Sequence, residues 1–185
     1  MASMPRHLLG VMFLVASLVP PAQAAPGDEE APFGLTWGPM SQVPRPSEID
    51  REANVTALTY LAGHPPAIGS STGKVVLEVC REEGLQRIVW FSRVLTASQL
   101  QSVYTGIYQE GVRLYGVPVA GTRSFSVTWP TARTVLTVHA VPGGGEQIIM
   151  AADGRDYAIC SQRHRDETGH TADSHTAELL HEQVR

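Results

Sequence analysis

Residues 69–73, with the sequence Gly-Ser-Ser-Thr-Gly, match the letters of the G-x-S-x-G motif, in which a serine nucleophile lies on a strand-to-helix turn. Ser71 would be the nucleophile, and Asp153 or Asp156 followed by His164 would complete a hydrolase triad in the usual chain order. The surroundings do not fit, because a histidine and two prolines precede the serine and a strand pattern, not a helix, follows it. We therefore interpret this segment as a flexible loop.

The C-terminal region gathers imidazole and carboxylate groups, which are suitable ligands for a divalent metal ion. These are His164, His170, His175 and His181, with Asp166, Glu167, Asp173 and Glu178. Histidine spacings of five and six residues match no compact helical or zinc-finger arrangement, and a loose chain would lose conformational entropy on closing around an ion. We therefore predict a solvated tail and no catalytic, cofactor-binding or metal-binding residue. His139 lies in an alternating strand pattern, so we interpret it as a half-buried structural residue, and His64 lies beside two prolines, so we interpret it as a loop residue.

Five aromatic side chains leave two interpretations open. They are Trp37, Trp90, Phe91, Phe125 and Trp129. They would either line a ligand groove or pack in the core, where each contributes a large apolar area.

Residues 1–24 have the pattern of a secretory signal peptide. Arg6 and His7 form a short basic region, Leu8 to Val19 is apolar, and Ala22-Gln23-Ala24 has the small-x-small form of a cleavage site. The apolar run is shorter than the roughly 20 residues that span a bilayer. We expect an exported protein, periplasmic or secreted, with no integral membrane segment in the mature chain.

The charge of the chain argues against a nucleic-acid partner. The full chain of 185 residues has a formal net charge of -4 and a single lysine, Lys74. Removal of the leader takes away one arginine and no acidic residue. The mature chain therefore carries no clustered excess of basic residues for binding phosphates.

Cys80 and Cys160 are the only cysteines. An exported chain with an even number of cysteines favours pairing in an oxidising compartment, so we predict a Cys80–Cys160 disulfide. The alternative is two separate buried thiols.

Hydrophobic periodicity predicts a linker over residues 25–32, one domain over 33–160 and a polar, disordered tail over 161–185. Alternating segments predict a strand near 55–61, a hairpin of 75–80 with 85–95, and strands over 124–129, 134–141, 146–151 and 155–160. A short helix is expected at 47–53. The main helix is expected after Thr96, where Thr96 and Gln99 have the form of a capping box, and Gly116 would end it.

This order predicts an α+β fold, in which an antiparallel sheet of about five to six strands carries one main helix on one face. The sequence also resembles a group of small exported bacterial proteins of uncharacterised function. The resemblance rests on Phe33-Gly34-Leu35-Thr36-Trp37-Gly38, Tyr115-Gly116-Val117-Pro118 and Trp129. It implies export and this architecture, and it brings no activity with it.

We therefore expect an exported, non-enzymatic binding module of the cell envelope, whose partner is an envelope protein or a small apolar ligand. The alternative is a small secreted hydrolase or metal-dependent enzyme that uses Ser71 or a histidine cluster. A third interpretation is an assembly factor that makes contacts through its acidic tail.

Overall fold

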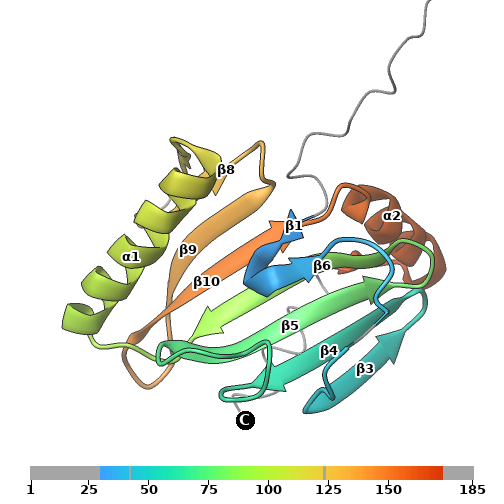
Figure 1. The fold of residues 1–185 in the computed structure, drawn as a ribbon, viewed down its shortest axis with the longest axis horizontal. Helices are drawn as coiled ribbons and strands as arrows, with labels where there is room; N and C mark the ends of the chain where they lie inside the picture. Colours follow the sequence, from blue (N-terminus) through green and yellow to red (C-terminus); the bar gives the residue numbers. More distant parts are fainter. Residues whose placement is uncertain (1–29, 42, 123, 173–185) are drawn as a thin grey trace, which may run out of the picture.

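The computed structural model describes residues 30–41, 43–122 and 124–172, which form an α+β fold around one antiparallel sheet (Figure 1). The sheet has eight strands in the order β3-β4-β5-β6-β10-β9-β8-β7. Their bounds are β3 Glu48–Glu52, β4 Val55–Leu61, β5 Thr72–Cys80, β6 Gly84–Ser92, β7 Val119–Ala120, β8 Val127–Trp129, β9 Thr134–Ala140 and β10 Glu146–Asp153. A separate two-stranded ribbon pairs β1 (Glu30–Ala31) with β2 (Leu35–Thr36) around the 3-10 turn η1 (Pro32–Gly34).

The main helix, α1 (Ala97–Tyr115), begins and ends where its sequence predicts. The capping box between Thr96 and Gln99 is formed at its start. Gly116, with a φ of 82°, follows its last residue and its N–H bonds to the carbonyl of Val112. Both ends of the helix thus satisfy backbone groups that would otherwise lack partners.

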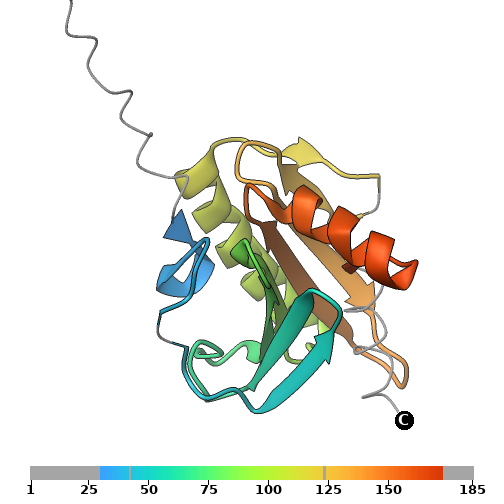
Figure 2. The ribbon, with the colours of Figure 1, turned by 90° about the vertical axis from the view of Figure 1, so that its right-hand side faces the viewer.

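The two faces of the sheet carry different side chains and different helices. One face buries the large apolar core, which includes Leu77, Ile88 and Trp90 and is covered by Leu100 and Tyr104 of α1. The second helix, α2 (Tyr157–Thr168), lies on the other side of the sheet (Figure 2). Alternation along β6 and its neighbours therefore sends every second residue toward α1 and the others toward the α2 side.

The α+β class, the antiparallel sheet and its one main helix are as predicted, but the number of strands is larger than the expected five to six. Two of the additional strands lie at the edges. The segment expected as a short helix at 47–53 is the edge strand β3, paired with β4 from Glu48↔Thr59 to Glu52↔Val55. At the other edge, β7 has two residues, too few for alternation to be recognised.

The predicted strand over 155–160 is wrong, because residues 155 and 156 form a turn and α2 begins at Tyr157. The buried residues of α2 are Tyr157, Cys160, Ser161 and His164, and their spacing of three, four and seven residues is helical. The predicted domain ends at Cys160 and the predicted tail begins at Ser161. This boundary cuts the helical pattern in two, so neither half is recognised as a helix. Residues 161–172 thus belong to the described fold, and 173–185, with His175 and His181, lie outside the described residues.

The expected linker also differs, because Glu30 to Pro32 already belong to β1 and η1. The predicted signal peptide, residues 1–24, lies outside the described residues. Within the described part of the chain, neither helix has the combination of length and apolar composition that a membrane span requires.

Candidate metal centre

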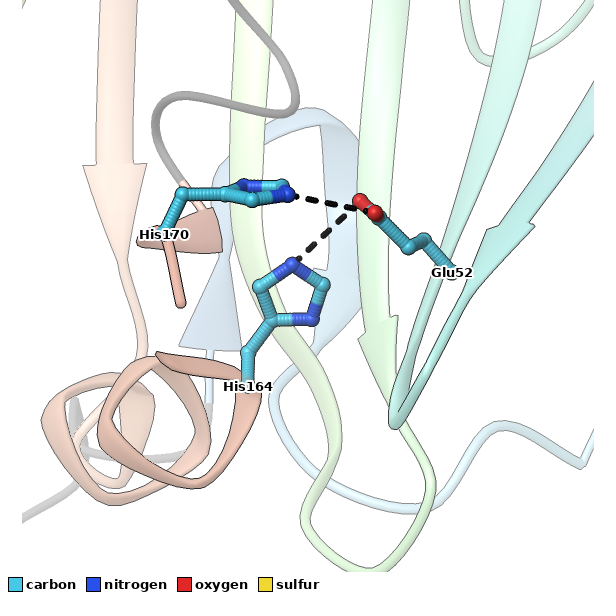
Figure 3. A group of neighbouring side chains, drawn as sticks. All are labelled: Glu52, His164 and His170. Carbon is cyan, nitrogen blue, oxygen red and sulfur yellow. Dashed lines mark hydrogen bonds and ion pairs between the residues drawn. The ribbon is translucent and has the colours of Figure 1, made fainter. Parts of the chain in front are cut away.

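Three side chains from separate segments converge beside α2: Glu52, His164 and His170 (Figure 3). His164 Nε2 lies 3.5 Å from one carboxylate oxygen of Glu52, and His170 Nε2 lies 3.2 Å from the other. The two imidazole rings meet edge to face, with their centroids 5.4 Å apart. One potential ligand atom from each residue lies within 4.8 Å of the others, so the three form a compact group with one carboxylate and two imidazoles.

The turn between β3 and β4 positions Glu52. Glu52 is the last residue of β3 and pairs with Val55 at the start of β4. Between them, Ala53 takes a left-handed conformation with a φ of 49°, and the buried Asn54 donates a hydrogen bond of 3.2 Å to the carbonyl of Cys160. Asn54 therefore holds the turn that carries Glu52 against α2.

The predicted disulfide is confirmed, and it lies directly beside the site. It joins Cys80, the last residue of β5, to Cys160 of α2, with the Cα atoms 6.1 Å apart. His164 follows Cys160 by four residues, so both side chains lie on the same face of the helix. The disulfide thereby fixes the helical turn that presents His164, whose side chain is fully buried.

His170 is placed by the end of α2. Gly169 takes the left-handed conformation after the helix, with a φ of 87°, and its N–H bonds to the carbonyl of Arg165. The hydroxyl of Thr168 lies 2.8 Å from the carbonyl of His164 and 3.0 Å from that of His170. This tight turn brings His170 back over the helix to face Glu52.

A charged network anchors the first turn of α2 on the sheet. Arg87 donates a 2.6 Å hydrogen bond to the hydroxyl of Tyr157 and lies over its ring at 4.8 Å. Burial disfavours the guanidinium, but the neighbouring carboxylates Glu78 and Asp153 outweigh that effect and raise the pKa of Arg87. Burial, followed by the charge of Glu78, raises the pKa of Tyr157, which therefore remains a neutral phenol.

The donor set and the spacing of the group are compatible with a zinc ion. Zinc binds imidazole nitrogen and carboxylate oxygen at about 2.0–2.1 Å, so two ligands of a tetrahedral ion lie about 3.3 Å apart. The two nitrogen-to-oxygen separations in the site, 3.5 and 3.2 Å, are close to that value, but they end on the two different oxygens of Glu52. Small side-chain rotations would therefore have to bring one oxygen, or both, to a shared ion. Glu52 and His170 each keep 35 % of their side-chain surface exposed, so an ion could reach the site and keep a further ligand position toward solvent.

The hydrolase residues considered from the sequence are not brought together. Ser71 lies just before β5, whereas His164 lies beside the far end of that strand at Cys80. A strand of nine residues is about 26 Å long from its first residue to its last. Ser71 is therefore too far from His164, and from Asp153 or Asp156 beside α2, for proton transfer.

The other histidines take no part in the group. His139 lies exposed on β9, not half-buried as expected, and its ring contacts the hydroxyl of Thr137 at 3.0 Å. His64 lies in the turn after β4, as expected.

The aromatic residues divide between the core and a cleft. Phe91 and Trp129 are almost fully buried, whereas Phe125 is 45 % exposed. Trp90 and Trp129 also form part of the wall of a cleft of about 420 Å³ between α1, η1 and the sheet. Among its other lining residues are Phe33, Gly106 and Met150.

His164 and His170 are considered as ligands from the sequence, but the prediction there is a solvated tail without a metal site. Sequence reasoning misses Glu52, which is 112 residues before His164 and has no local signal of its role. The fold and the site together define an α+β protein with one antiparallel sheet and a group of two histidines and one carboxylate at one end of that sheet. No protein-family model, curated protein or solved structure was found to match this chain.

Proposed function

We propose that this protein is an exported binding module that holds a divalent transition-metal ion, with zinc as the best match, through Glu52, His164 and His170. The observation that carries the proposal is the convergence of three ligand atoms, one from the end of β3 and two from the end of α2 and the turn after it, to within 4.8 Å of one another. Export is part of the proposal and is supported by the pattern of residues 1–24 and by the disulfide.

The chemistry of the group favours zinc over calcium or magnesium. Calcium and magnesium prefer sets of oxygen ligands, whereas imidazole suits zinc, copper, iron and nickel. Two histidines and a glutamate with an open fourth position also occur in catalytic zinc sites. A metal-dependent enzyme is therefore the alternative to a binding module, and zinc binding is the step that both require.

Zinc titration of the untagged, chelator-treated mature protein tests the proposal, since a polyhistidine tag would bind the same ion. We expect one zinc ion per oxidised chain by calorimetry. Glu52→Gln and His170→Asn should each lower the affinity by at least about tenfold, the smallest loss typical even for residues that only orient a ligand. His139→Asn is the matched control and should leave the affinity unchanged, because His139 is an exposed strand residue remote from the group.

Two results would contradict the proposal. One is an affinity that is unchanged in Glu52→Gln and His170→Asn. The other is loss of binding only when His175 and His181 are replaced, which would assign the ion to the C-terminal segment. Zinc at 100 times its dissociation constant should also stabilise the wild-type fold by about 2.7 kcal/mol, and the Glu52→Gln variant much less.

The cleft beside α1 supports a small, uncharged apolar ligand as a second candidate function. Its walls are largely aromatic and aliphatic, and an added Cβ at Gly106 meets no atom within 4 Å. Gly106→Phe should therefore fill the cleft and abolish binding of a neutral apolar dye such as N-phenyl-1-naphthylamine. Gly106→Ala is the control and should still bind it. Equal dye binding by both variants would exclude the cleft.

A further inference from the structure

A second potential ligand group lies next to the first and contains the two sulfur atoms of the disulfide. Cys80, Cys160 and Glu83 each place one ligand atom within 4.8 Å of the others. Cys80 ends β5, Glu83 is in the turn before β6, and Cys160 comes from α2. The sulfur atoms are not ligands while they are bonded to each other, so this group depends on the redox state of the pair.

The carboxylate of Glu83 is incompletely satisfied in the oxidised protein. Its Oε1 accepts a hydrogen bond of 2.7 Å from Arg163. Its Oε2 is buried and has no hydrogen-bond partner among the described residues. A buried carboxylate oxygen without a partner is costly, and a cation coordinated there would remove that cost.

We propose that reduction of the Cys80–Cys160 disulfide creates a second metal site, in which both thiolates and Glu83 bind a thiophilic divalent ion such as Zn²⁺. A dithiol reductant supplies two electrons and two protons to the S–S bond, and it becomes a disulfide itself. Coordination of the ion then releases the two thiol protons. The site shares no ligand with the Glu52 site, so the proposal does not rest on zinc binding by Glu52, His164 and His170.

Charge and geometry both suit such an ion. Two thiolates and Glu83 carry a charge of minus three, which Arg163 and a divalent ion balance. Zinc–sulfur bonds of about 2.3 Å place the sulfurs of a tetrahedral site about 3.8 Å apart. With the Cα atoms 6.1 Å apart, rotation of the two side chains can provide that separation. The amide of Asn54, 3.7 Å from the Cys160 sulfur, is positioned to donate to a thiolate, as outer partners of metal ligands commonly do.

The test compares oxidised and reduced forms of the untagged mature protein under anaerobic conditions. A phosphine reduces the disulfide and is removed, two free thiols are confirmed by titration, and Co²⁺ or Zn²⁺ is then added alone. The reduced protein should bind one zinc ion more than the oxidised protein. With Co²⁺ it should show thiolate-to-metal charge-transfer absorption, which the oxidised protein lacks.

Matched variants on one turn identify the third ligand. Glu83→Gln should lower the affinity of the reduced site for Zn²⁺ by at least about tenfold. Glu82→Gln should leave it unchanged, although Glu82 also contacts Arg163, because its side chain is 68 % exposed. Glu52→Gln should lower the zinc affinity of the oxidised protein by at least about tenfold and leave the charge-transfer band of the reduced protein intact. This comparison separates failure of one site from failure of the other.

Near-ultraviolet circular dichroism shows whether the reduced protein is folded before metal is added. A folded, fully reduced protein without the additional ion or the band would overturn the proposal, as would equal affinities in Glu83→Gln and Glu82→Gln. If reduction unfolds the chain, Zn²⁺ should restore the native spectrum and Co²⁺ should give the band. Failure to do either would also overturn it.

Discussion

Replacement of Cys80 and Cys160 together by alanine removes the covalent link between β5 and α2. The two residues are 80 positions apart in the chain. In the chain-entropy model, a closed loop of that length corresponds to about 4.5 kcal/mol of stabilisation at 25 °C. Alanine is preferable to serine, because both positions are buried and a hydroxyl there would need a hydrogen-bond partner. We therefore expect the variant to lose about 4 kcal/mol of unfolding free energy.

Urea denaturation followed by tryptophan fluorescence measures this loss. The variant should have a lower midpoint and also a larger m value, because its unfolded chain lacks the cross-link and exposes more surface. Its zinc affinity should fall by about tenfold or more, since Cys160 fixes the helical turn that presents His164. A stability loss below about 1 kcal/mol with unchanged zinc affinity would refute this reasoning and show that packing alone holds α2.

Further predictions concern α1 and the one lysine. Gly111→Ala should destabilise the protein by about 1 kcal/mol, because the added Cβ would overlap the Trp129 ring and overpacking outweighs the gain in helix propensity. Gly106→Ala on the same helix should instead stabilise the protein by about 0.5–1 kcal/mol, since nothing lies within 4 Å of the added Cβ. Thermal unfolding measures both variants, and a melting temperature that shifts in the same direction in both would contradict this contrast. Burial lowers the pKa of Lys74, an effect that Glu48 partly offsets, so the folded state loses this proton at a lower pH than the unfolded state. The unfolding free energy of the wild type, relative to that of Lys74→Met, should therefore rise with pH between the lowered pKa and about 10.5. Urea titrations across this range measure that difference, and a difference that stays constant would refute the prediction.

The parts of the fold that the sequence predicts are those with strong local signals. The capping box at Thr96, the alternation on both sides of the turn before Gly84 and the paired cysteines each identify their element without knowledge of the rest. The edge strands β3 and β7 lack such signals. β3 has mostly charged residues because it borders solvent, and its pairing with β4 rather than its own side chains makes it a strand.

The candidate metal site could be only half predicted, for a related reason. The helical spacing from Tyr157 to His164 is readable in the sequence, and it would have shown that His164 faces inward. Glu52 resembles any other acidic residue on a surface strand until the turn after β3 is placed against α2. That contact depends on the Asn54 hydrogen bond and the disulfide, which are tertiary interactions between residues more than 75 positions apart in the chain.

The attachment of α2 is itself an argument for a functional site at this end of the sheet. Two of the four side chains that the helix buries, Ser161 and His164, are polar, and a third belongs to the disulfide. Burial of apolar area therefore contributes less to its docking than it does for α1. A covalent bond, the hydrogen bond from Asn54 and the ion pair of Arg163 with Glu83 hold it instead. These interactions bury little additional apolar area. They do fix the orientation of His164 relative to Glu52, and a metal site requires its ligands to be held in fixed orientations.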